Sequence, residues 1–322
     1  MNIFCESHVT AIYTEEHMVK SDFYLRLIEW DTPLTVESLS FSLYAGRELQ
    51  YQRSYDQLQV RQKLRYAAAE LKRYRASSMY RILGQERVLP QAVMHEYFSV
   101  YTFQPVDRCV IRAAGRGFSM EREVAVSGYA SPNRYFFPMK GTFLVSDTYA
   151  SINSHRWCRN SEFAMDIGSF SADLAVQNIW GESVYAACGG QVAEVFDGLE
   201  DSDENTAFDQ IEEKYGEHAR IDGNHVLLRH SGGEYTLYSH LLKGSVSVRV
   251  GDLVQPLTLI GRVGSSGSSR IPHLHFHGMR DGIGGRGIPV QFENIVSFLG
   301  APCSLNETTN IVVTQEPQSA IQ

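Results

Sequence analysis

The sequence lacks a long apolar run. No stretch approaches the roughly 18 consecutive apolar residues that cross a bilayer as a helix, and the first residues have no basic start followed by an apolar segment. We therefore expect neither a transmembrane segment nor a signal peptide in this chain. Basic charge is also scarce, because 29 Lys and Arg side chains stand against 37 Asp and Glu, for a formal net charge of -8. This balance argues against a general partner of nucleic acids or anionic membranes.

Cysteine is rare as well. The five cysteines are an odd number, are widely scattered and form no C-x-x-C pair. This pattern excludes a dense disulfide framework and a cysteine-based zinc knuckle. What is present, 43% hydrophobic and 20% charged residues in a chain of 322, is typical of a folded protein with one large or two moderate domains.

Residues 1–128 carry the pattern of several short strands. Between Ser38 and Leu43 polar and apolar residues alternate strictly, which is the period of a half-buried strand with Leu39, Phe41 and Leu43 on its buried face. Further runs rich in aromatic and β-branched residues lie at 23–30, 97–103, 108–113 and 121–127. We predict a β-sandwich-like accessory domain over residues 1–128.

One helix interrupts these strands. Apolar residues recur at spacings of four and three between residues 60 and 74, which predicts a helix near 54–76. Ser54 and Gln57 have the spacing of a capping box at its start. The basic residues between Arg61 and Arg75 form a local cluster, which we interpret as a solvated face, with docking of an anionic polymer as the alternative.

The residues Gly-Tyr-Ala-Ser-Pro-Asn at 128–133 indicate a linker, so a second domain is expected over 129–300, followed by a flexible polar tail at 301–322. This domain is also predicted to be β, which makes the fold class mostly β. An acidic, flexible insertion at 197–222 is expected to shape the access of substrate to this domain. The strands of the second domain are expected at 184–187, 190–196, 225–230, 235–240, 257–263 and 273–277.

The segment from Pro272 to His277 alternates histidine with bulky apolar residues. In a strand, residues two apart share one face at a separation of about 6.6 Å, so Leu274 and Phe276 should enter the core while the histidines converge on the other side. Convergent histidines suit a metal site, and an exposed polar strand face is the alternative. We expect the last of them, His277, to face solvent, with an outer-shell role as the alternative.

Other ligands are needed, because a hydrolytic zinc site takes about three nitrogen or oxygen ligands and an open position for water. Asp166 is a lone carboxylate in the apolar run 163–168. A buried, unpaired carboxylate is costly, so either metal coordination or a salt bridge would explain it. His155 and His240, each taken alone, indicate nothing more than a loop histidine and a histidine at a strand end.

Together these segments resemble zinc metallopeptidases of the LytM or lysostaphin type, peptidase family M23, over residues 135–292. The likeness is collinear, because the similar segments follow one another in the family's order. Phe137-Pro138-Met139-Lys140-Gly141 resembles the family's first strand, and the further segments are 181–187, Gly223-Asn224-His225-Val226 with His230, Tyr238-Ser239-His240-Leu241, 250–252, 260–264 and His273-Leu274-His275-Phe276. The resemblance implies an antiparallel β catalytic domain.

The resemblance implies that His155, Asp166 and His275 hold one zinc ion per chain and that His240 and His273 are the catalytic histidines. Eleven positions separate His155 from Asp166, more than in the commoner family pattern, so the loop between them is longer. Zinc lowers the pKa of its bound water toward 7, one histidine can accept the proton, and the other can steady the oxyanion. Either histidine can be the base.

The resemblance also implies the reaction. We expect a zinc metalloendopeptidase that hydrolyses peptide bonds in bacterial peptidoglycan, working in the cell envelope or outside the cell, with peptidoglycan peptides as its partners and no nucleic acid. A noncatalytic or latent cell-wall-binding or regulatory module of the same fold is the alternative. The full set of five site residues favours the enzyme.

Overall fold

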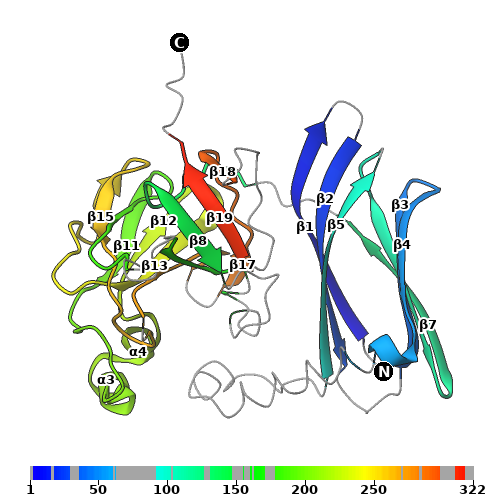
Figure 1. Cartoon of the computed structure of the whole chain (residues 1–322), viewed down its shortest axis with the longest axis horizontal. Coiled ribbons are helices and arrows are strands. Elements are labelled where there is room, and N and C mark those ends of the chain that lie inside the picture. Colours follow the sequence, from blue (N-terminus) through cyan, green and yellow to red (C-terminus); the bar gives the residue numbers. More distant parts are fainter. Residues whose placement is uncertain are drawn as a thin grey trace. The chain divides into compact units, whose positions relative to one another are not determined.

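The structure is a computed structural model of the chain (Figure 1). By its internal contacts the chain divides into two compact units, Met1–Ala130 and Ser131–Gln322. The residues that the structure describes are 3–15, 18–29, 36–60, 62, 92–102, 104–126, 131–146, 155, 160–161, 163–170, 178–269, 271–282, 285–297 and 309–315.

The first unit contains two antiparallel sheets. One has three strands in the order β1-β2-β5, and the other has four in the order β4-β3-β6-β7. The strands are β1 (Ile3–Glu15), β2 (Met18–Glu29), β3 (Val36–Ala45), β4 (Glu48–Tyr55), β5 (Ala92–Thr102), β6 (Arg108–Gly115) and β7 (Phe118–Ala125). The predicted strands of this region overlap β2, β3, β5, β6 and β7, whereas β1 and β4 were not predicted.

The alternating segment behaves as its period predicts. Leu39, Phe41 and Leu43 on β3 are buried. Their partners across the strand pair, among them Ile111 opposite Phe41 and Cys109 opposite Leu43, are buried too. Cross-strand pairs of this kind stabilise a sheet because each apolar side chain removes its neighbour from water.

The predicted helix begins two residues later than expected. Ser54 pairs with Ser40 inside β4, so its backbone belongs to the sheet ladder. The capping box is instead formed by Asp56 and Gln59: the Gln59 amide donates to Asp56 Oδ1 at 2.9 Å, and the Asp56 amide donates to Gln59 Oε1 at 3.0 Å. Residues 57–60 are helical, whereas Arg61 and the basic residues beyond 62 lie outside the described residues.

The second unit is built on one large sheet, which Figure 1 shows beside the short helices α3 and α4. Its strand order is β14-β11-β12-β13-β16-β9-β8-β19-β18, with β17 paired to β16, and β10 and β15 form a separate pair. The elements are β8 (Thr142–Ser146), β9 (Met165–Ser169), β10 (Ser183–Tyr185), β11 (Gly190–Phe196), α3 (Phe208–Tyr215), α4 (Glu217–Asp222), β12 (Asn224–Arg229), η3 (Ser231–Gly233), β13 (Glu234–Leu241), β14 (Leu253–Val254), β15 (Leu259–Arg262), β16 (Leu274–Arg280), β17 (Arg286–Ile288), β18 (Ile295–Ser297) and β19 (Thr309–Thr314). The mostly β, antiparallel fold class is confirmed.

Strand β16 occupies the middle of this sheet, between β13 and β9. Leu274 and Phe276 are fully buried, as the alternation predicts, and the Phe276 ring packs edge to face on Tyr238 with ring centroids 5.3 Å apart. The register sets His275 opposite Asp166 on one side and opposite Ser239 on the other. Residues directly opposite in an antiparallel pair share a face, so the sheet itself brings His275 and Asp166 together.

Two expectations about the ends of this unit were wrong. Residues 137–141 are not a strand, because their backbone bonds go to other partners: the Phe137 amide donates to Asn294 Oδ1, and the Pro138 carbonyl accepts from the Tyr185 amide. The first strand begins at Thr142 instead. The tail is not wholly flexible, since β19 pairs with both β8 and β18.

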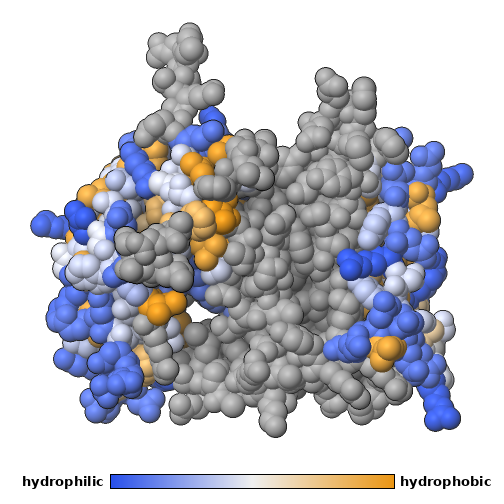
Figure 2. Space-filling model, in the orientation of Figure 1, coloured by the Kyte–Doolittle hydropathy of each residue, from blue (hydrophilic) through white to orange (hydrophobic). Residues whose placement is uncertain are grey.

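The insertion at 197–222 is ordered rather than loose. It forms α3 and α4, and hydrophilic side chains gather over both (Figure 2). Arg220 of α4 is buried and pairs with Glu212. Ser202 Oγ donates to the Gly267 carbonyl at 2.6 Å, which ties the insertion to the loop before β16. Among the described residues no helix has the length and apolar character needed to cross a membrane.

Candidate metal centre

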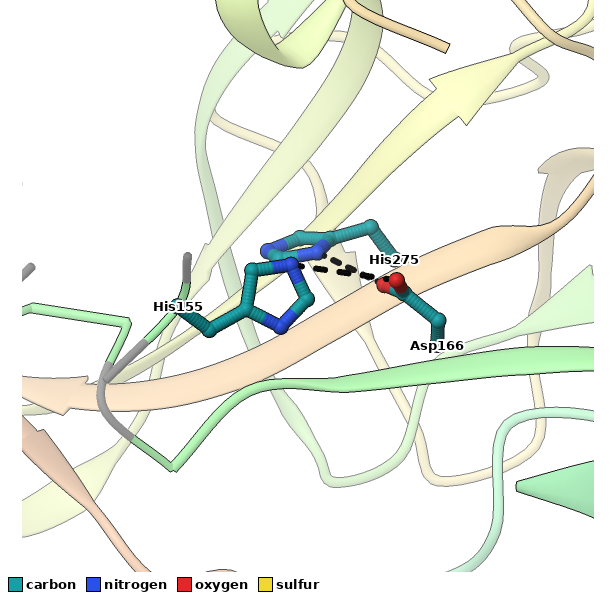
Figure 3. A group of neighbouring side chains, drawn as sticks. All are labelled: His155, Asp166 and His275. Atoms are coloured by element: carbon teal, nitrogen blue, oxygen red, sulfur yellow. Dashed lines mark hydrogen bonds and ion pairs between the residues drawn. The ribbon is translucent and has the colours of Figure 1, made fainter. Parts of the chain in front are cut away.

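Three side chains converge at the centre of the second unit. Asp166 comes from β9 and His275 from β16, and His275 Nδ1 donates a hydrogen bond to Asp166 Oδ1 at 3.0 Å. His155 precedes Asp166 by eleven positions in the chain, and its Nε2 atom lies 3.8 Å from Asp166 Oδ2. Figure 3 shows the two imidazoles and the carboxylate turned toward one another, and one potential ligand atom from each residue lies within 4.8 Å of the other two.

The electrostatics of this group favour an ionised carboxylate. Burial alone would raise the pKa of Asp166, but the charges and hydrogen bonds of His155, His275 and His273 together lower it below its ordinary value. An ionised carboxylate and two imidazoles are ligand types that zinc prefers. The donor set therefore fits a zinc ion.

His240 and His273 stand beside these three residues. Their ring centroids are 4.7 Å apart, and the His240 ring lies 5.9 Å from that of His275. His273 Nε2 is 3.6 Å from Asp166 Oδ1. The structure thus brings all five predicted site residues into one cluster, while their individual roles stay predictions.

Both of these histidines are oriented by backbone carbonyls that precede β16 in the chain, those of Ser266 and Ile271. His240 Nδ1 lies 2.8 Å from the Ser266 carbonyl oxygen, and His273 Nδ1 lies 2.9 Å from that of Ile271. A carbonyl can only accept, so each Nδ1 carries a proton and donates it. In the neutral ring the Nε2 lone pair then faces away from the carbonyl and is available as a proton acceptor.

His240 is held in an unusual backbone conformation at the end of β13. Its φ angle is 62°, in the left-handed region that L-residues other than Gly, Asn and Asp seldom adopt. Burial, followed by the nearby His273 and His275, lowers its pKa to about 3. The imidazole is therefore neutral near pH 7, as a proton acceptor must be.

Asn224 holds the surroundings of Ser266 together. Its side-chain oxygen accepts from the amides of Gly198 and Leu199, and its side-chain nitrogen donates to the carbonyls of Leu199 and Leu241. Its backbone amide donates to Ser266 Oγ at 2.9 Å. One fully buried side chain thus fastens the start of the insertion and the strand end that carries His240, and its backbone fastens the residue that orients His240.

His277 departs from expectation. It is 2% exposed, not on a solvent face, and its Nδ1 atom lies 3.0 Å from His275 Nε2. The strand is central in its sheet, and the end of the insertion helix at Asp222 adds a negative charge that acts on His277. Neither feature is visible in a local sequence pattern. Ser266, Ile271 and Asn224 were missed as orienting groups for the same reason.

The comparison with protein families now bears on this geometry. Residues 170–285 match the family model described as peptidase family M23. The predicted resemblance is confirmed. The matched residues include His240, His273 and His275, whereas His155 and Asp166 lie just before them. Peptidases of this family are metallopeptidases, so residues 170–285 carry a metallopeptidase-type fold.

Solved structures also show likeness. The catalytic domain of a mutant of the prophage-encoded M23 protein EnpA from Enterococcus faecalis is 18% identical over 51% of this chain and 95% of its own, with a TM-score of 0.29. The catalytic domain of lysostaphin from Staphylococcus simulans is 24% identical over 39% of this chain and 73% of its own, with a TM-score of 0.26. The SpoIIQ–SpoIIIAH pore forming complex is 18% identical over 49% of this chain and 89% of its own, with a TM-score of 0.32. No curated protein matches the chain.

Proposed function

We propose that this chain is a zinc metalloendopeptidase that cleaves peptide bonds in bacterial peptidoglycan. The observation that carries the proposal is the cluster of His155, Asp166 and His275, with ligand atoms within 4.8 Å of one another, beside the two oriented histidines. The match of residues 170–285 to the M23 family supports the reaction class.

His155, Asp166 and His275 would hold the zinc ion. When bound, zinc supplies a water of lowered pKa and polarises the carbonyl of the scissile peptide bond. Asp166 contributes the negative charge of the ligand set, because the histidines around it keep its pKa below the ordinary value. His275 is held in place by the pairing of β16 with β9 and by its hydrogen bond to Asp166 on β9.

His240 and His273 move the proton and steady charge. Each donates its Nδ1 proton to a backbone carbonyl, that of Ser266 or Ile271, which leaves Nε2 free of that bond, and His273 Nε2 lies 3.6 Å from Asp166 Oδ1. A neutral Nε2 can accept a proton from the attacking water, and the partner ring, once protonated, can donate to the oxyanion of the tetrahedral intermediate. The ring centroids of His240 and His273 are 4.7 Å apart, so both rings can act on one substrate carbonyl.

The substrate class comes from the family rather than from the site. The M23 resemblance is the reason for naming peptidoglycan peptides as substrate and for placing the activity in the cell envelope or outside the cell. The net charge of -8 argues against a nucleic acid as partner, because like charges repel.

The test is mass spectrometry of fragments released from purified peptidoglycan by the zinc-loaded protein. The wild type should release peptide fragments whose new termini identify the bond, and the His273→Ala variant should not. His95→Ala is the matched control, since His95 lies on β5 of the other unit. A chain that binds one zinc ion but releases nothing from several wall types would instead be a noncatalytic or latent module of the same fold.

A further inference from the structure

The ring of His277 is placed against the rear of the candidate ligand His275. Both residues lie on the same face of β16, two positions apart, and Leu237 of β13 stands opposite His277. His277 Nδ1 lies 3.0 Å from His275 Nε2, and the two ring centroids are 5.2 Å apart. His275 is therefore flanked by Asp166 at one ring nitrogen and by His277 at the other.

The proton positions follow from what each neighbour can do. In the metal-free protein the Asp166 carboxylate can only accept, so His275 donates from Nδ1 and its Nε2 accepts from His277. A cation held at His275 Nδ1 would displace that proton, because it would take the lone pair of that nitrogen. The neutral His275 ring would then carry its proton on Nε2 and could donate it to the Nδ1 atom of His277, 3.0 Å away.

We propose that His277 is a positioning residue that sets the tautomer and ring orientation of His275 for metal binding. This inference rests on the proposed zinc function. An imidazole can both donate and accept at Nδ1, according to its tautomer, so His277 can follow His275 through the change from metal-free to metal-bound protein. Outer-shell partners of this kind fix the ring of a metal ligand, and their loss typically weakens metal binding about 10 to 100-fold.

Hydrogen bonding elsewhere does not explain His277. The Nε2 atom of His277 is buried and has no hydrogen-bond partner among the described residues. Within those residues the ring has one hydrogen-bond partner, His275, which it meets at Nδ1. A buried polar atom without a partner is unfavourable for the fold. A phenylalanine ring would fill similar space without that atom, so packing alone gives no reason for histidine at this position.

Two variants separate hydrogen bonding from shape. His277→Phe keeps a ring of similar size but can neither donate nor accept. His277→Asn loses the ring but keeps an amide that can do both near the position of Nδ1. The metal-free full chain and each variant are titrated with zinc against a chromogenic chelator, and thermal unfolding of the metal-free forms shows whether each is folded.

The expected result is a zinc affinity about 10 to 100-fold weaker in His277→Phe and within a few fold of the wild type in His277→Asn. The reverse order, with Phe tight and Asn weak, would mean that shape matters and would overturn the inference, as would equal affinity in all three. If His277→Phe does not fold, His277→Asn decides alone, since a tenfold loss there contradicts the proposal and a wild-type value supports it. A wild type that binds no zinc would contradict the proposed function itself, which is a different outcome.

Discussion

Strands β3 and β16 share one sequence pattern but differ in chemistry. Both alternate bulky apolar residues with polar ones, and both bury the apolar set, Leu39, Phe41 and Leu43 in one and Leu274 and Phe276 in the other. The alternate positions of the segment 38–43 on β3 are serines, of which Ser38 is exposed, Ser40 half-buried and Ser42 buried. The alternate positions at the start of β16 are His275 and His277, and His275 meets Asp166 of β9, His155 and His240 of β13.

The difference shows what the period of a strand does and does not determine. Alternation assigns each residue to a face in both strands. Whether the second face becomes a site depends on the neighbouring strands and on the segments above it. On β16 the register sets the ionised Asp166 carboxylate opposite His275, whereas Ser40 on β3 lies opposite Ser54 and Arg112.

The largest expected effect comes from removing a ligand on β16. His275→Ala should lower zinc affinity by more than about 100-fold, beyond the range for outer-shell residues, because one of three ligands is lost. Its match on β3 is Ser40→Ala, which should leave zinc binding unchanged and shift the free energy of unfolding by less than about 0.5 kcal/mol. Metal titration and urea unfolding measure both, and wild-type affinity in His275→Ala would remove the contrast between the two strands.

The same titration applied to His155→Ala tests a ligand that lies eleven positions before Asp166, a wider spacing than in the commoner family pattern. We expect weaker zinc binding, since His155 Nε2 lies 3.8 Å from Asp166 Oδ2 and His155 would supply one of the three ligands. Unchanged affinity would mean that another residue is the third ligand.

A smaller and more selective effect is expected at His240. His240→Ala should keep its zinc but lose turnover by on the order of 100-fold or more, because the proton acceptor or oxyanion donor is removed and the ligands are not. Peptide release and metal content measured on one preparation test this. Parallel loss of zinc and activity would place His240 among the ligands instead.

The pH dependence of folding should report the burial of His240 on β13, the strand next to β16 in the sheet. Burial and neighbouring histidines lower the pKa of His240 to about 3 in the metal-free fold, whereas an unfolded histidine titrates near 6.5. Between these values the unfolded state binds a proton that the folded state does not, so stability is full above pH 6.5 and falls as pH falls toward 3.

From pH 7 to 4.5 the expected loss from this residue is on the order of 2 kcal/mol. Urea unfolding of the metal-free wild type and of His240→Gln measures it, and the variant should lose less over the same interval. A wild type that gains stability on acidification would contradict the burial of a neutral imidazole.

Much of the fold could be predicted because it follows local periodicity. The alternation of β3 and β16 places their apolar residues correctly, and the predicted strands overlap β11, β12, β13 and β15. The helix start was misplaced because Ser54 has cap chemistry but is taken by the β4 ladder, which leaves the cap to Asp56. Strand β19 was missed because it is formed by pairing with β8, more than 160 residues earlier.

For the site, too, some residues could be named from the sequence and others depend on the fold. Residue type and order, compared with the M23 family, were enough to name His155, Asp166, His240, His273 and His275, which the structure brings together. The groups that orient them could not be named. Two are backbone carbonyls, which any sequence supplies, and His277 is a histidine whose burial depends on the strand order.

The most direct test of the central claim is the zinc dependence of bond cleavage. Purified peptidoglycan is incubated with the wild-type protein after chelation, and again after one equivalent of zinc is restored, and the new peptide termini are identified by mass spectrometry. We predict no new termini after chelation and recovery of one defined cleavage on adding zinc. Cleavage that persists in the chelated protein and in His275→Ala would contradict the account.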